Sequence, residues 1–139
     1  RKTDATGSMD KDRSQGAAST EDGEASVMSL SENDRMFVEK ATDIVLDNIS
    51  NTDFSIDALC REMAMSRTLF YSRLKSLTGR APQEFIRIIR LERAAELLKN
   101  GGSVVDVSEA TGFINVKYFS TVFKKYFGIQ PSRYAEETD

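Results

Sequence analysis

The chain of 139 residues has no histidine, no tryptophan and a single cysteine, Cys60. One cysteine cannot form a disulfide within the chain, which suits a reducing compartment. Without histidine or a glycine-rich phosphate loop, the sequence lacks the groups that enzymes usually gather into an active site. We therefore expect no enzymatic activity in this chain, no metal site and no cofactor.

Long apolar runs are also missing. No stretch reaches about eighteen apolar residues, the length that a membrane-spanning helix needs, and no signal-peptide pattern opens the chain. We expect a cytoplasmic chain without membrane contact, which leaves open an anchor elsewhere in a longer protein.

Negative charge is in excess only toward the ends. Residues 1–34 carry four Lys/Arg and eight Asp/Glu, whereas residues 53–134 carry thirteen Lys/Arg and eight Asp/Glu. The net charge of −3 therefore hides a basic central part, which favours a polyanionic partner.

Residues 1–30 are rich in Ser, Gly, Asp and Glu and contain no aromatic residue. Such a segment has too little apolar surface to offset the entropy of ordering, so we predict a flexible acidic linker or tail. Because the first residue is Arg rather than Met, we expect that it joined an upstream domain. A cloning remnant is the alternative for part of it.

From Ser31 onward, apolar residues recur at helical spacing, and nothing shows the period-two alternation of strands. Ser31 with Asp34, and Ser103 with Asp106, resemble capping boxes. Cys60 lies on the apolar side of its predicted helix, which indicates a buried structural thiol. We predict an all-α domain of about seven helices over residues 31–139.

Two segments repeat one layout, in which a short helix, a tight turn and a longer basic helix are followed by glycine and proline. They lie at about 55–79 and 103–128, with a long helix at about 82–100 between them. This is the helix-turn-helix plan, whose second helix enters the DNA major groove. Nineteen helical residues span roughly 28 Å, against roughly 34 Å between successive major-groove faces. We therefore predict two helix-turn-helix subdomains whose recognition helices lie in adjacent grooves.

The two sides of each recognition helix differ at 100° per residue. The predicted core side consists of Phe70, Leu74 and Leu77 in the first helix and of Phe119, Val122, Phe123, Tyr126 and Phe127 in the second. The opposite side carries Thr68, Ser72 and Lys75, flanked by Tyr71, in the first and Lys117, Thr121 and Lys124 in the second. Neither helix contains an acidic residue, which favours contact with nucleic acid over a merely solvated surface.

The sequence leaves open an alternative function for the chain and two roles for three of its arginines. A helical module that binds an acidic partner protein is the alternative function, whereas the deep, narrow major groove of RNA excludes a helix. The arginines of the long helix have two possible roles. Arg87, Arg90 and Arg93 could contact phosphates or pair with Glu84, Glu92 or Glu96.

The segment "SVVDVSEATGFINVKYFSTVFKKYFGIQPSRYAEE" (103–137) resembles the signature of the AraC/XylS-type transcription regulators, and residues 65–99 resemble the preceding half of the same domain. The matching positions are Gly112-Phe113, Tyr118-Phe119, Phe123-Lys124-Lys125, Gly128, Pro131 and Tyr134. The resemblance implies two helix-turn-helix subdomains joined by a long helix, which bind DNA to control transcription. Ser108 and Cys60 stand where the family usually has alanine, and both are small enough to fit.

The resemblance also implies which side chains read bases. The base-contact candidates are Thr68, Tyr71, Ser72, Val116, Lys117, Ser120 and Thr121. The phosphate-contact candidates are Arg67, Lys75, Lys124 and Lys125. Val116 departs from a polar base reader and could instead touch a thymine methyl group.

The first predicted helix, "SENDRMFVEKATDIVLDNI", and the acidic segment before it resemble the output end of bacterial response regulators and of Bacteroidetes hybrid two-component systems. The expected partners are double-stranded DNA and either RNA polymerase or an upstream sensor or receiver domain. A dimer on the DNA is compatible with the sequence, which leaves open the operator, the signal and the direction of regulation.

Overall fold

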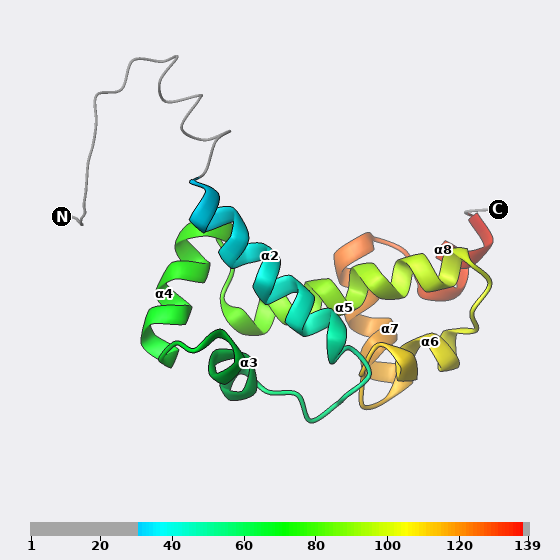
Figure 1. The fold of residues 1–139 in the computed structure, drawn as a ribbon. Helices are drawn as coiled ribbons and strands as arrows, with labels where there is room; N and C mark the ends of the chain where they lie inside the picture. The colour runs from blue at the N-terminus through cyan, green and yellow to red at the C-terminus, as the bar shows by residue number, and fades with distance from the viewer. Residues whose placement is uncertain (1–30, 138–139) are drawn as a thin grey trace, which may run out of the picture. The chain divides into compact units, whose positions relative to one another are not determined.

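The computed structural model describes residues 31–137, and this part of the chain contains seven α-helices and no strand (Figure 1). The helices are α2 (Glu32–Asp47), α3 (Ile56–Met63), α4 (Arg67–Thr78), α5 (Pro82–Lys99), α6 (Val104–Ala110), α7 (Val116–Phe127) and α8 (Pro131–Glu137). The predicted all-α class with two helix-turn-helix subdomains and a long linker helix is confirmed. The predictions for residues 1–30 lie outside the described residues.

Side-chain caps define where the short helices begin. The hydroxyl oxygens of Ser55, Ser66 and Ser103 accept hydrogen bonds from the backbone N–H three residues on, at 3.1, 3.2 and 3.1 Å. The Asn115 side-chain oxygen accepts from Tyr118 N at 2.7 Å in the same way. Each cap satisfies an N–H group that has no partner inside its helix.

Left-handed residues end three of the helices. Gly79 and Gly128, which close α4 and α7, have φ angles of 77° and 87°, a region that glycine adopts at little cost. Ala64, which closes α3, has a φ of 59° although it is not glycine. The chain therefore turns sharply between α3 and α4, as the first helix-turn-helix unit requires.

Contacts group the residues from Phe37 onward into one unit, which has two hydrophobic clusters. The first cluster joins α2, α3 and α4 to the amino-terminal half of α5. Its buried members are Phe37, Ala41, Ile44, Val45, Leu59, Cys60, Met63, Phe70, Leu74, Phe85, Ile86 and Ile89. Cys60 is buried as predicted.

The second cluster joins the carboxy-terminal half of α5 to α6 and α7. Its buried members are Leu91, Ala94, Ala95, Leu98, Val107, Phe113, Phe119 and Phe123, with Phe127 and Tyr134 of α8 packed against them. Ser108, at the position where the family usually has alanine, is also buried. Because α5 contributes to both clusters, it carries one helix-turn-helix unit on each half (Figure 1).

The first turn of α2 begins with a side-chain cap. The Ser31 hydroxyl oxygen accepts a hydrogen bond from Asp34 N at 3.1 Å, as the capping-box pattern predicts. Among the described residues, no helix combines the length and the apolar character that crossing a membrane requires.

Candidate nucleic-acid interface

The exposed side of α4 carries the first group of predicted contact residues. Phe70 and Leu74 are buried beneath the helix, so Thr68, Tyr71 and Ser72 project away from the core. Tyr71 is 46% exposed. These three residues and Arg67 line one surface hollow of about 360 Å³. The structure thus brings the predicted base readers of α4 together with one predicted phosphate contact.

Arg67 has an acidic partner that the sequence did not reveal. Its guanidinium donates to Asp57 Oδ1 of α3 at 2.8 Å, and both side chains are exposed. An exposed ion pair of this kind contributes little to stability. Arg67 can therefore exchange Asp57 for a phosphate at small cost. The other phosphate candidate of α4, Lys75, is exposed one helical turn beyond Tyr71.

The exposed side of α7 carries the second group. Phe119 and Phe123 are fully buried, whereas Val116, Lys117, Thr121 and Lys124 are exposed and Ser120 is half-buried. The Thr121 hydroxyl donates to the Lys117 carbonyl at 3.0 Å, which leaves its oxygen free to accept a hydrogen bond. The first turns of α7 therefore offer a cation, a hydroxyl acceptor and a small apolar group.

Lys125 lies on a different flank of α7 from Lys124. It lines a hollow of about 370 Å³ together with Arg80 and with Arg87 and Glu84 of α5. The two lysines, although adjacent in the sequence, therefore face different surroundings. Lys124 lies on the side of Lys117 and Thr121, and Lys125 lies toward α5.

Two exposed apolar side chains beside the recognition helices were not singled out from the sequence. Leu69 in the first turn of α4 is 61% exposed, and Ile114 in the turn before α7 is 83% exposed. Apolar side chains can contact the methyl group of thymine in the major groove. The helical wheel of α4 already placed Leu69 about 100° away from Phe70, so its exposure was predictable from the sequence.

The three arginines of α5 have different surroundings in the structure. Arg93 donates to Glu96 Oε1 at 2.8 Å in an exposed pair. Arg90 is buried and donates to backbone carbonyl groups. Arg87 is exposed, and no ion pair of the described residues includes it. Of the three, only Arg87 has a guanidinium that can reach a phosphate without losing an internal partner.

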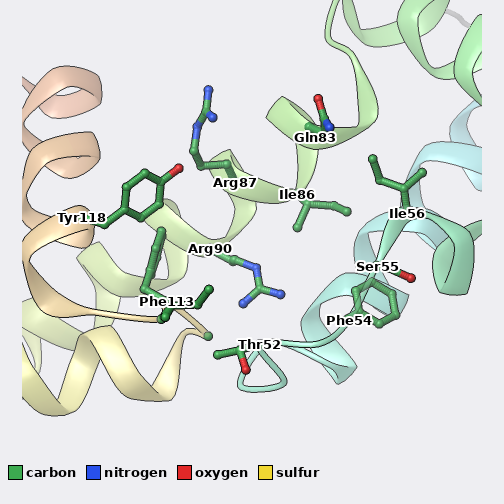
Figure 2. Close-up of a pocket in the computed structure, with 12 residues that line it drawn as sticks. Thr52, Phe54, Ser55, Ile56, Gln83, Ile86, Arg87, Arg90, Phe113 and Tyr118 are labelled. Carbon is green, nitrogen blue, oxygen red and sulfur yellow. The ribbon is translucent and has the colours of Figure 1, made fainter.

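A groove of about 500 Å³ lies between the two helix-turn-helix units. Figure 2 shows Thr52 to Ile56, before and at the start of α3, on one side and Phe113 with Tyr118 on the other. Arg87 and Arg90 come from α5 between them, and their guanidinium groups point away from each other. No acidic residue lines the groove, so its surface is compatible with a negatively charged partner.

The prediction that Tyr126 is a core residue is wrong. Tyr126 is 39% exposed, although the helical wheel placed it almost directly above Phe119. It lies in the last turn of α7, where its ring centroid is 4.8 Å from that of Phe127 in a T-shaped arrangement and its hydroxyl donates to Glu92 Oε2 at 3.3 Å. The apolar stripe therefore extends beyond the cluster, and Tyr126 keeps its polar end at the surface, as tyrosine commonly does.

Burial shifts the pKa of the Cys60 thiol and of the Arg90 guanidinium, both outside the recognition surface. Desolvation raises the pKa of the Cys60 thiol, and the nearby Arg67 partly opposes this. A thiol with a raised pKa forms little of the reactive thiolate, which agrees with a structural role. Desolvation also lowers the pKa of the Arg90 guanidinium, which still leaves an arginine charged under ordinary conditions.

The sequence matches the family described as Helix-turn-helix domain over residues 59–137. The chain belongs to the AraC-type helix-turn-helix family. This family consists of DNA-binding transcription regulators rather than enzymes. The resemblance inferred from the sequence is thereby confirmed.

Known members place the AraC-type domain in larger proteins. The chain is 40% identical over 110 residues to Histidine kinase P4 of Formosa agariphila; the match covers 78% of this chain and 8% of the kinase. Other curated relatives are covered over 24% to 30% of their length. The chain thus spans a minor part of each relative.

Solved structures agree with this assignment. The C-terminal domain of AraT, a response regulator from Geobacillus stearothermophilus, has a TM-score of 0.66 and 26% identity, and the match covers 73% of this chain and 84% of that one. The DNA-binding domain of AdpA, a global transcriptional factor solved in complex with a target DNA, has a TM-score of 0.66 and 27% identity, with 72% and 90% covered.

Proposed function

We propose that this chain binds double-stranded DNA in a sequence-specific manner and thereby regulates transcription, with α4 and α7 in successive major grooves. The observation that carries the proposal is the pair of acid-free recognition helices. Phe70 is buried under α4, and Phe119 and Phe123 are buried under α7, whereas every predicted base reader is exposed except the half-buried Ser120. A helix that presents hydroxyl, cationic and apolar groups together can distinguish the base edges of the major groove.

The length of α5 supports placement in successive grooves. Its 18 residues span roughly 27 Å, somewhat less than the roughly 34 Å between successive major-groove faces. A modest bend of the duplex, or an inclination of the recognition helices, accommodates the difference. The AdpA domain, solved with a target DNA, supports a DNA-binding role for this chain.

Contacts to the DNA backbone would supply most of the affinity. We assign phosphate contacts to Arg67, Lys75, Lys124 and Lys125, as the sequence indicates, and add Arg87 because it is exposed beside the groove between the units. Base contacts stay with Thr68, Tyr71, Ser72, Val116, Lys117, Ser120 and Thr121, and Leu69 is added as an apolar reader.

We further propose that the chain is the output domain of a two-component signalling protein and acts in the cytoplasm. The similarity to Histidine kinase P4 and to the C-terminal domain of the response regulator AraT supports this. An upstream sensor or receiver domain would then control the DNA-binding domain, and RNA polymerase would be its partner at a promoter. Two copies bound to neighbouring sites fit the same arrangement.

Selection from a pool of random duplexes tests the DNA-binding proposal. We expect the chain to enrich one bipartite sequence, whose two conserved blocks lie about one helical turn apart. Affinity for that duplex should fall steeply with salt and exceed affinity for a scrambled duplex at every salt concentration. Equal affinity for scrambled DNA, and for an acidic protein used as a competitor, would instead favour the alternative module that binds an acidic partner.

A further inference from the structure

Arg90 is a buried cation held by carbonyl oxygens instead of a carboxylate. Its side chain in the middle of α5 is 7% exposed, and none of the ion pairs in residues 31–137 includes it. One terminal nitrogen donates to Ile49 O at 3.0 Å and to Thr111 O at 2.9 Å. The other donates to Asn51 O at 3.2 Å.

Two of these carbonyls lie just before the first helix-turn-helix unit, and the third lies in the second unit. Ile49 and Asn51 lie in the connection between α2 and α3, 41 and 39 residues from Arg90. Thr111 ends α6, 21 residues away on the other side. A single side chain of the linker helix therefore holds the backbone that leads into the first unit and the backbone of the second unit at once, in the lining of the groove between the units (Figure 2).

Gly112 makes this close contact possible. Its φ angle is +83°, and a Cβ atom there would collide with the Arg90 guanidinium and with the Ile49 carbonyl oxygen. The backbone of the second unit can approach Arg90 and the connection between α2 and α3 only because position 112 has no side chain. The contact with Arg90 and Ile49 therefore requires glycine at this position, as does the turn before α7.

Stability alone does not explain a buried arginine here. Removing a cation from water is costly, and well-packed apolar residues often replace buried charged groups without loss of stability. Hydrogen bonds from the planar guanidinium are directional, however, and arginine can hold several acceptors in fixed relative positions. An apolar side chain would fill the same space without fixing the direction of either backbone segment.

We propose that Arg90 is a positioning residue, which holds α4 and α7 at one relative separation and so makes the chain select one spacing between its two DNA half-sites. The part that concerns DNA rests on the proposed function. The part that concerns the separation of the two helices does not, and it can be tested without DNA.

The DNA-free test measures the distance between spin labels on the two recognition helices by pulsed electron paramagnetic resonance. Labels are attached at Lys75→Cys and Lys124→Cys, both exposed positions, in a Cys60→Ala background that removes the native thiol. We expect a narrow distance distribution with Arg90 and a distribution at least about twice as wide with Arg90→Met, because the directional bonds are lost. Arg93→Met, an exposed arginine of the same helix, is the control and should leave the distribution narrow.

An unchanged distribution in a folded Arg90→Met chain would overturn the proposal. If Arg90→Met does not fold, Arg90→Lys replaces it, because lysine keeps the charge but cannot reproduce the planar fork. A folded Arg90→Lys chain should then show the broader distribution, and a narrow distribution equal to that of Arg90 would count against the proposal in the same way.

The second test uses the duplex selected by the unmodified chain and versions with one base pair added or removed between the half-sites. Two linked contacts gain affinity only when both can form together. The preference for the selected spacing should fall by about tenfold in Arg90→Met, while affinity for a duplex with a single half-site stays unchanged. An equal loss on single half-sites would show that Arg90 only maintains the fold.

The outcomes of the two experiments separate the two proposals. If the unmodified chain selects no sequence, the proposed function fails, and the spin-label distances still decide whether Arg90 positions the helices. If the chain selects a bipartite site and Arg90→Met keeps the same spacing preference, the role of Arg90 fails and the proposed function stands.

Discussion

The two helix-turn-helix units follow one backbone plan with different cores. The first is supported by the 16-residue α2 and is mostly aliphatic, although the ring centroids of Phe37 and Phe70 lie 5.7 Å apart. The second contains the seven-residue α6 and is supported by α8, which also has seven residues. It contains a continuous series of rings in which Phe119 and Phe123 have centroids 5.5 Å apart.

This difference shows how short helices can still complete a core. A helix of two turns brings few side chains to an interface, so each must bury a large area, and aromatic side chains do this best. Tyr134 in α8 thus meets both Phe123 and Phe127 at 5.4 Å. The many aromatic residues among the lysines of α7 therefore serve mainly to build the second unit, and the lysines occupy its other sides.

The recognition surfaces of the two units differ as well. In α4 the first-turn cation, Arg67, is paired with Asp57, the predicted base readers are neutral, and Lys75 is the one phosphate candidate that no ion pair of the described residues includes. In α7 no ion pair of the described residues includes Lys117, Lys124 or Lys125. We infer that the second unit contributes more of the salt-dependent affinity, and that the first unit acts more through hydroxyl and apolar contacts.

The largest expected effect concerns the aromatic core of the second unit. Phe119→Ala should lower the free energy of unfolding by about 3–5 kcal/mol, because it removes a fully buried ring and leaves a cavity. Urea denaturation followed by circular dichroism measures this change. Tyr118→Ala is the matched control, since its ring is exposed, and should cost about 1 kcal/mol or less. Equal losses in the two variants would contradict the aromatic-core interpretation.

A smaller effect is expected from the base readers of the two units. Lys117→Ala should reduce discrimination between the selected duplex and single-base variants by about 1–3 kcal/mol at the positions beneath α7. Thr68→Ala should do the same beneath α4 and leave the α7 positions unchanged. Competition binding with single-base variants measures both. If Lys117→Ala altered neither affinity nor base preference, the recognition surface of the second unit would be misassigned.

The smallest expected effect concerns single phosphate contacts. Lys124→Ala and Lys125→Ala should each weaken binding to all duplexes alike and lower the slope of log affinity against log salt by about one. Lys40→Ala is the control, because this lysine is exposed on α2, outside both recognition helices. Fluorescence anisotropy over a range of salt concentrations gives the slopes. A slope that changes as much in Lys40→Ala would mean that net charge alone is responsible.

Local signals in the sequence predicted most of the fold. Ser103 caps α6 as its capping-box pattern indicates, and the glycines that the repeated layout puts after the recognition helices, Gly79 and Gly128, end them. Such signals act within one turn of the chain and need no knowledge of distant segments. The burial of Phe70 and Phe119 followed from helical periodicity for the same reason, since each helix has one apolar side.

The sequence was less informative wherever a side chain meets a distant segment. Helical periodicity placed Tyr126 in the core. It shows which side of α7 is apolar, but it cannot show how far along α7 other helices cover that side. The pairing of Arg67 with Asp57 joins two helices across a turn, and a count of charges does not reveal it.

The sequence by itself determined the seven helices, their order and the acid-free sides of α4 and α7, because capping, glycine turns and periodicity are properties of neighbouring residues. Only the tertiary structure decided among Arg87, Arg90 and Arg93, which are alike in the sequence. Arg90 is buried because carbonyl groups 21 to 41 residues away converge on it. That convergence depends on how the two units pack against α5, which no local pattern encodes.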